Sequence, residues 1–376
     1  MRAMGFRHKG FQLMRHRFHA ICPYFAMFPE GFVARWIERL TLPGDLVADP
    51  FCGRGTTPFQ ALLMERRAFG MDVNPVAYCV TRAKTNAPSL KELLSRLSHL
   101  EEDFGVAPKI PHSSELPEFF QHCFDSETLL QILYLRKQLD WRTDDIDAML
   151  TALTLGSLHG DLNNAGSYLS NQMPRTISTK PAYSVRYWKR NNLEPPKRDV
   201  FDVLQRAAVR RYASDPPKGR GHVERNDVRT LSRFAELYRS VDCVITSPPY
   251  FDTTNFEEDQ WLRLWFLGGP PRPTKNQISR DDRHESRSKY WAFIGAMWRA
   301  LGHVVRPGGN VVVRLGGRDL EPEYLAQKLE AAAMFAEREV VLQSKEVSEL
   351  RNRQTDAFRP GSRGCRVEID CHFVLS

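Results

Sequence analysis

The chain has no long apolar run, no paired cysteines and no visible repeat, and each absence argues against a class of protein. No apolar stretch approaches membrane-spanning length, and the basic N-terminus lacks the apolar core of a secretory signal. The seven cysteines form no C-x-x-C pair, which argues against a zinc or disulfide framework. We therefore expect a soluble cytoplasmic protein whose thiols are mostly buried and reduced.

The excess of basic residues is confined to one segment. The formal net charge is +8, and residues 171–225 alone carry thirteen Lys or Arg against five acids. Aromatic residues are interleaved with these charges, a pattern that favours a surface following nucleic-acid phosphates. The same pattern also fits an ordinary solvated loop. The candidate nucleic-acid-binding residues are Arg175, Lys180, Arg186, Lys189 and Arg190.

A glycine-rich turn, Asp49 to Thr57, follows the first short apolar strand, predicted over 46–48. The helical pattern after the turn is predicted over 58–67. Such a junction places backbone N–H groups and the positive end of a helix together, ready for an anionic or polar cofactor. The turn lacks the third glycine of a dinucleotide site and the Lys-Ser/Thr of a Walker loop.

Two further strand ends carry polar residues. The strand predicted over 68–71 ends at Asp72, which can accept both hydroxyls of a ribose or simply cap the next helix. Another apolar run, 241–245, leads through Thr246 into Ser-Pro-Pro-Tyr at 247–250. Two prolines force a stiff, extended loop there, because each lacks an N–H and fixes its φ. That loop suits a ligand site at the edge of a sheet, and it also suits a turn with a packing tyrosine.

These segments together resemble the S-adenosylmethionine (SAM)-dependent amino-methyltransferases that modify exocyclic amines of DNA bases. Ser-Pro-Pro-Tyr is usual in the cytosine-N4 enzymes, and Asp-Pro-Phe-x-Gly-x-Gly-Thr-Thr matches the SAM-binding motif, with Arg54 where the family often has serine. The resemblance covers residues 24–84 and 227–317. The cofactor motif comes first, as in the alpha arrangement, whereas cytosine-N4 members often have the reverse order.

The resemblance implies SAM as the cofactor, no metal, and a set of site residues. Tyr24 and Phe28 would line the methionine end of SAM, although aromatic residues there also pack as a staple, and Asp227 would accept from its adenine amine. The predicted catalytic residues are Ser247, Pro248, Pro249 and Tyr250. The predicted cofactor-binding residues are Tyr24, Phe28, Asp49, Phe51, Gly53, Gly55, Thr56, Thr57, Asp72, Asp227 and Thr246.

The predicted fold is α/β, a Rossmann-like seven-stranded methyltransferase sheet with a largely helical inserted lobe. Residues 1–85 would form the SAM-binding part, 86–225 the helical and basic DNA-recognition lobe, and 226–376 the part with the catalytic loop. Within the lobe, residues 171–198 contain four prolines and are expected to be mostly loop. An antiparallel pair of strands is expected over 337–343 and 366–375.

The function predicted from these residues is methyl transfer from SAM to the N4 amine of a flipped-out cytosine in double-stranded DNA. A cognate restriction endonuclease is a candidate partner. Three alternatives stay open: methylation of adenine N6 in DNA, methylation of an RNA base, and nucleic-acid binding without catalysis. Ser247 in place of aspartate favours cytosine over adenine.

Overall fold

A seven-stranded sheet forms the centre of the computed structural model, which describes residues 15–24, 29–106, 115–160, 166–172, 180–251, 255–278, 286–317, 320–349, 365 and 367–376. The strand order is β3-β2-β1-β4-β5-β7-β6, and only β7 runs antiparallel to its neighbours. The strands are β1 (Leu46–Asp49), β2 (Arg67–Met71), β3 (His222–Glu224), β4 (Val241–Thr246), β5 (Val305–Gly316), β6 (Val340–Glu349) and β7 (Val367–Leu375).

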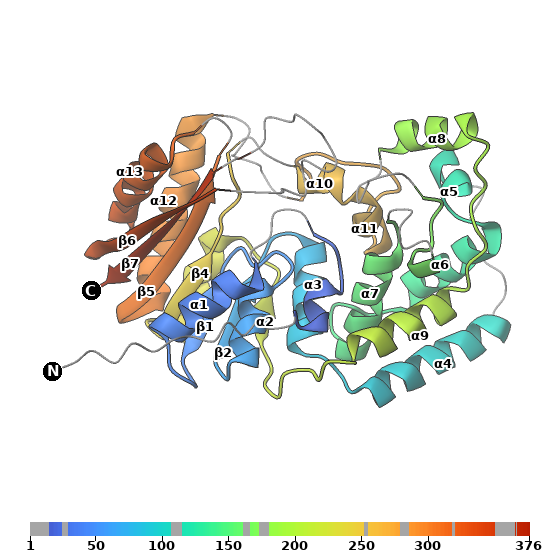
Figure 1. The fold of residues 1–376 in the computed structure, drawn as a ribbon, viewed down its shortest axis with the longest axis horizontal. Helices are drawn as coiled ribbons and strands as arrows, with labels where there is room; N and C mark the ends of the chain where they lie inside the picture. Colours follow the sequence, from blue (N-terminus) through green and yellow to red (C-terminus); the bar gives the residue numbers. More distant parts are fainter. Residues whose placement is uncertain are drawn as a thin grey trace, which may run out of the picture.

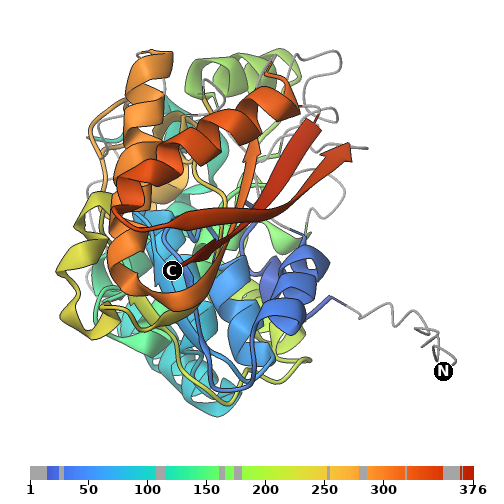
Figure 2. The ribbon, with the colours of Figure 1, turned by 90° about the vertical axis from the view of Figure 1, so that its left-hand side faces the viewer.

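Helices cover both faces of this sheet. The first part of the chain supplies α1 (Glu30–Leu40), α2 (Thr56–Leu63) and α3 (Pro75–Thr85), and the last part supplies α12 (Arg287–Val304) and α13 (Pro322–Ala333). Figure 2 shows α12 and α13 lying across the strands at the C-terminal end of the sheet. Side chains alternate between the faces: Val47 packs with α1 and α2, while Leu46 and Ala48 pack with α12. Burial of both faces is expected for parallel strands.

A helical lobe stands beside the sheet, with α3 between the two (Figure 1). Its helices are α4 (Leu90–Val106), α5 (Glu118–Cys123), α6 (Ser126–Gln138), α7 (Asp145–Ser157), α8 (Pro181–Arg190) and α9 (Val200–Arg211). Two short helices, α10 (Phe256–Asp259) and α11 (Trp261–Phe266), follow the loop after β4 and return to the lobe. Apolar residues of α2, α3, the lobe and α11 form one continuous core.

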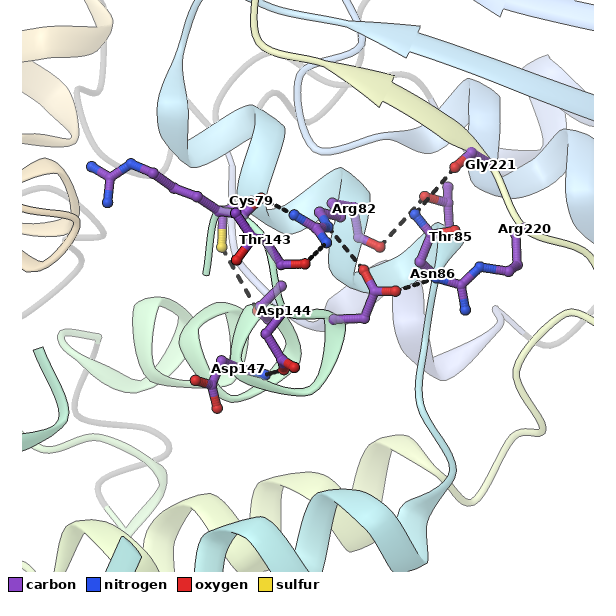
Figure 3. Close-up of polar contacts among 12 residues, drawn as sticks. Cys79, Arg82, Thr85, Asn86, Thr143, Asp144, Asp147, Arg220 and Gly221 are labelled. Atoms are coloured by element: carbon purple, nitrogen blue, oxygen red, sulfur yellow. Dashed lines mark hydrogen bonds and ion pairs between the residues drawn. The ribbon is translucent and has the colours of Figure 1, made fainter. Parts of the chain in front are cut away.

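A polar joint fixes α3 against the beginning of α7 (Figure 3). The Arg82 guanidinium bonds to Asp145 at 2.8 Å and donates to the Thr143 carbonyl at 2.6 Å. Asp145 also pairs with Arg220, which precedes β3. Asn86, just after α3, donates to the Gly221 carbonyl at 3.1 Å. These contacts therefore connect α3 both to the helical lobe and to the segment that precedes β3.

Several sequence predictions require correction. The helix predicted over 58–67 is α2, which ends at Leu63, and Arg67 already begins β2. The segment expected to be mostly loop, 171–198, contains the helix α8. Its Pro181 occupies the first turn, where a missing N–H costs no hydrogen bond. The strand predicted over 337–343 is β6, which begins at Val340 and runs to Glu349.

No helix in the described part of the chain is both long enough and apolar enough to cross a bilayer.

Candidate active site

The predicted site residues follow the carboxyl ends of four adjacent strands. The glycine-rich turn follows β1, Asp72 follows β2, Asp227 comes shortly after β3, and Ser247 follows β4. Parallel neighbours end at the same edge of a sheet, so these segments meet there. Of the predicted residues, Phe28 and Arg175 lie outside the described residues, and nothing further is concluded about them.

Hydrogen bonds link the turn after β1 to the loop after β4. The Thr246 hydroxyl donates to the Asp49 carboxylate at 2.6 Å, and the Thr57 hydroxyl donates to the Ile245 carbonyl at 3.1 Å. Asp49, Thr57 and Thr246 are all buried. Burial raises the pKa of Asp49 to about 7, although Thr246 and the Phe51 amide bond to the carboxylate. These side chains therefore hold the two loops together, and we assign them a positioning role.

Asp72 organises the glycine-rich turn. One carboxylate oxygen accepts from the Gly53 amide and the other from the Asn74 amide, each at 2.9 Å. Gly53 has a φ of +51°, which favours glycine. Gly55 has a φ of +73°, and a Cβ there would lie 2.6 Å from the Thr81 hydroxyl. Glycine at position 55 is therefore required both by the backbone and by the packing of the turn on α3.

Tyr24 covers this turn from the N-terminal segment. A Cβ on Gly53 would meet the Tyr24 ring at 3.5 Å, and the Tyr24 hydroxyl accepts from Asn74 at 2.8 Å. Asn74 also reaches Gln260 at 3.4 Å. Burial is the main cause that raises the pKa of Tyr24 above its usual value, so the phenol stays neutral. Sequence reasoning missed Asn74, although an Asn before Pro75 is a recognisable helix cap.

Arg54 holds the N-terminal segment in place. Its guanidinium is buried and donates to the His19 carbonyl at 2.7 Å and to the Glu30 carboxylate at 3.2 Å. Arg15 binds the same carboxylate at 2.8 Å. The side chain whose role the sequence left open thus points away from the turn and anchors the segment that carries Tyr24.

Phe51 and Asp227 lie toward α12. The Phe51 ring meets Phe293 at 5.7 Å between centroids, and the Arg229 guanidinium lies 5.9 Å from the centre of the Phe293 ring. Asp227 pairs with Arg229 at 2.7 Å and caps the short helix that follows. Burial acts to raise the pKa of Asp227, but its bonds with Arg229 outweigh burial and the pKa is lowered. The carboxylate is therefore ionised near neutral pH.

The Ser-Pro-Pro-Tyr loop is tied to β7. The Ser247 hydroxyl donates to the Tyr250 oxygen at 3.4 Å, and the Tyr250 hydroxyl donates to Glu368 at 2.7 Å. A Cβ on Gly316 would lie 2.9 Å from the Tyr250 ring, so the bare Gly316 backbone lets that ring approach β5. The sequence contained no local signal for Glu368, which lies 118 residues away from its partner.

The residues predicted to bind nucleic acid lie on or next to α8. Lys180, Arg186, Lys189 and Arg190 are exposed, and Lys189 pairs with Glu118 of α5. Figures 1 and 2 both show α8 at the top of the view and α4 at the bottom, and Figure 1 shows α10, which follows the loop after β4, in the upper part as well. Helix α8 therefore lies at the same end of the molecule as the loops of the candidate site.

The strand order and the loops at one edge of the sheet define a class: a Rossmann-like α/β fold of the SAM-dependent methyltransferase type. The turn after β1, with its two left-handed glycines, Tyr24 over Gly53 and a half-buried Asp72, fits that cofactor. Residues 9–81 match the model of the N6/N4 family of DNA methylases. The matched segment contains this turn, and both findings support SAM as the cofactor.

Two curated relatives extend the likeness. Over 277 residues, the chain is 24% identical to the Type II methyltransferase M.MvaI of Kocuria varians, covering 69% of this chain and 59% of that protein. Over 90 residues it is 31% identical to the Type II methyltransferase M.MjaII of Methanocaldococcus jannaschii, covering 23% and 17%. The chain thus spans less than two thirds of the length of either relative. These matches support a DNA amino-methyltransferase and do not distinguish between cytosine and adenine.

Among solved structures, TrmN from Thermus thermophilus is 11% identical with a TM-score of 0.37, covering 96% of this chain and 53% of that one. The rRNA methyltransferase AviRa from Streptomyces viridochromogenes is 13% identical with a TM-score of 0.32, covering 94% and 87%. At these TM-scores the likeness carries no weight for function.

Proposed function

We propose that this chain methylates the exocyclic N4 amine of cytosine in double-stranded DNA. The observation that carries the proposal is the bond between Thr246 and Asp49, which joins the cofactor turn to Ser-Pro-Pro-Tyr. A methyl donor held by the turn and an amine held by Ser247 would then be neighbours. Proximity of this kind supplies a large share of the rate enhancement in group transfer.

The chemical difficulty is the weak nucleophile, because the N4 lone pair is delocalised into the cytosine ring. SAM supplies an electrophilic methyl group when bound: the amine lone pair forms the new N–C bond, the C–S electron pair stays on sulfur, and the nitrogen releases one proton to water. The Ser247 hydroxyl and the Pro248 carbonyl accept the two amine hydrogens. They thereby stabilise the positive charge that develops on nitrogen.

DNA must present this amine outside the duplex. Flipping a base costs a few kcal/mol, and stacking on an aromatic ring returns about 1–3 kcal/mol. Tyr250 is half-buried and adjoins Ser247, so its ring is the candidate platform. Stacking alone does not exceed the cost, and phosphate contacts from α8 would supply the remaining affinity. We further propose that the protein acts in the cytoplasm, with a cognate restriction endonuclease as a candidate partner.

Adenine N6 is the second candidate target, since the matched family includes both kinds of enzyme and the cofactor motif comes first in this chain. The deciding experiment incubates the purified protein with methyl-labelled SAM and duplex DNA of mixed sequence, followed by mass spectrometry of the nucleosides. Label in N4-methylcytosine is the expected result. Label in N6-methyladenine would overturn the choice of base, and label only in a parallel RNA incubation would overturn DNA as the substrate.

A further inference from the structure

Two hydroxyl groups and a carboxylate form a series of hydrogen bonds behind the Ser-Pro-Pro-Tyr loop. Glu368 accepts from the Tyr250 hydroxyl at 2.7 Å, and Tyr250 in turn accepts from Ser247 at 3.4 Å. An ionised carboxylate can only accept hydrogen bonds, so Glu368 is the group to which the Tyr250 hydroxyl donates its one hydrogen bond. The Tyr250 oxygen is then left as an acceptor for Ser247.

The direction of these hydrogen bonds matters because a serine hydroxyl can donate as well as accept. Its one proton must point somewhere, and a proton directed at the substrate amine would repel the amine hydrogens. When the proton is directed at Tyr250, both lone pairs of the Ser247 oxygen are available for the amine. An aspartate at this position would need no such help, since its carboxylate has only acceptors.

We propose that Glu368 is a positioning residue which, through Tyr250, turns Ser247 into an acceptor for the substrate amine. The proposal rests on the function proposed above and adds a residue that lies on β7, outside both predicted motifs. It explains how serine can occupy the position at which related enzymes often have aspartate. It also gives the Tyr250 hydroxyl a task distinct from any stacking by its ring.

The surroundings of Glu368 keep it in place. Its second oxygen lies 3.3 Å from the Arg314 guanidinium, which binds Asp370 through two bonds of 2.6 and 2.8 Å. The side chains of Arg314 and Asp370 are 9% and 0% exposed, so this ion pair is rigid. Glu368 and Gly316 are paired neighbours in the sheet. Strand pairing and Arg314 thus aim the carboxylate at Tyr250.

Replacing Glu368 by glutamine can reverse the direction of these two hydrogen bonds without breaking them. The new amide can donate a hydrogen bond to the Tyr250 oxygen. The Tyr250 hydroxyl then donates to Ser247, and the Ser247 hydroxyl points toward the substrate. Arg314 keeps its partner Asp370, so the sheet is expected to fold. We expect Glu368→Gln to lower kcat at least tenfold while the affinity for SAM, measured by calorimetry, changes less than about twofold.

The test is a double-mutant cycle of Glu368→Gln and Tyr250→Phe, with kcat measured on duplex DNA of mixed sequence and methyl-labelled SAM. If Glu368 acts only through the Tyr250 hydroxyl, its substitution changes nothing further once that hydroxyl is gone. The double variant should therefore match Tyr250→Phe alone. Glu323→Gln, an exposed residue paired with Lys345, is the matched surface control.

The results that contradict the role of Glu368 differ from those that contradict the proposed function. Multiplicative losses in the double variant, or wild-type kcat in either single variant, would overturn the role of Glu368. Should Glu368→Gln fail to fold, as judged by thermal unfolding, Tyr250→Phe still tests the idea, because full activity of that variant contradicts it. Absence of methyl transfer by the wild-type protein would instead refute the proposed function itself.

Discussion

In the proposed reaction, Ser247 is a weak hydrogen-bond acceptor at a position that requires strong acceptance. Its oxygen has one proton and two lone pairs, and it lies at the end of a buried strand beside two prolines that fix the loop. Its function depends on where its proton is directed. The sequence predicted catalytic roles for Ser247 and Tyr250 because motif residues are adjacent in the chain, whereas Glu368 is brought to them only by the pairing of β5 with β7.

Removal of the Ser247 hydroxyl should affect the chemical step and little else. We expect Ser247→Ala to lower kcat by about 10²-fold, the usual scale for losing one preorganised polar group at a reacting centre. Single-turnover kinetics would isolate that step, and calorimetry would show unchanged affinity for SAM. Tyr250→Ala should weaken activity as well, through DNA affinity and also through the chemical step, because it removes the hydroxyl that orients Ser247. Wild-type single-turnover rates in Ser247→Ala would contradict the assignment.

Asp49 should make stability depend on pH. Its pKa is about 7 in the folded protein, above the 3.8 of a solvated aspartate, so the unfolded chain loses this proton first. Its contribution to stability is therefore complete below about pH 4 and is lost as the pH rises through 7, by on the order of 4 kcal/mol at most.

Asp49→Asn removes this titration while keeping an oxygen for Thr246. The stability of the variant relative to wild type should accordingly increase between pH 4 and pH 8, as measured by urea unfolding at each pH. Asp202→Asn, at an exposed position of α9, is the control. Parallel pH profiles for wild type and Asp49→Asn would show that Asp49 does not titrate in this range.

At the scale of elements, the strands that carry motifs were predicted well and the irregular ones were not. Strands β1, β2 and β4 are short apolar runs followed by turn residues, a pattern readable from the sequence. Strand β3 has three residues, too few to show any period. The prolines around α8 indicated a loop, because sequence alone does not reveal that Pro181 occupies the first turn of a helix.

Arg54 of the glycine-rich turn is expected to hold the segment between His19 and Glu30 in place for cofactor binding. Arg54 supplies bonds to both His19 and Glu30, and substitution by serine removes them and leaves the segment that carries Tyr24 without its anchor. We expect Arg54→Ser to weaken SAM binding by about 3–10-fold, the effect of one or two charge-assisted bonds acting indirectly. Calorimetry with Arg39→Ser, an exposed position of α1, as control measures the change. Equal affinities in the two variants would argue against this anchoring role.

The joint between α3 and α7 should contribute to the stability of the whole fold. The Arg82 side chain is 14% exposed and bonds to Asp145 and to the Thr143 carbonyl. We expect Arg82→Ala to lower the free energy of unfolding by about 1–3 kcal/mol, because the partly buried Asp145 carboxylate and the Thr143 carbonyl lose a charged donor. Urea unfolding compared with Arg206→Ala, which breaks exposed bonds to Asp202 and to the Gly166 carbonyl, gives the measurement. A loss no larger than that of the control would exclude such a role for the joint.

At the scale of the whole molecule, α8 lies at the end where the strand loops converge, and α4 lies at the opposite end (Figure 1). If α8 follows the DNA backbone, Arg186→Ala and Arg190→Ala should weaken binding to duplexes of any sequence. The slope of log affinity against log salt should fall by about 1 for each phosphate that no longer has a basic partner. Fluorescence anisotropy at several salt concentrations tests this, with Lys91→Ala on α4 as control. Equal slopes for the variants and the control would place the DNA elsewhere.

The pairing of β1 with β4 at the centre of the sheet also has a consequence for folding during synthesis. The Leu46 amide of β1 donates to the Asp242 carboxylate of β4, and the two residues are 196 positions apart in the chain. Ribosomes add about 5–20 residues per second, so roughly 10–40 s pass between the emergence of β1 and that of its partner. During that time α3 and the helical lobe can begin to form their shared core, to which α11 is added later, while one edge of β1 stays unpaired. The nascent protein therefore exposes an open sheet edge until β4 has been synthesised.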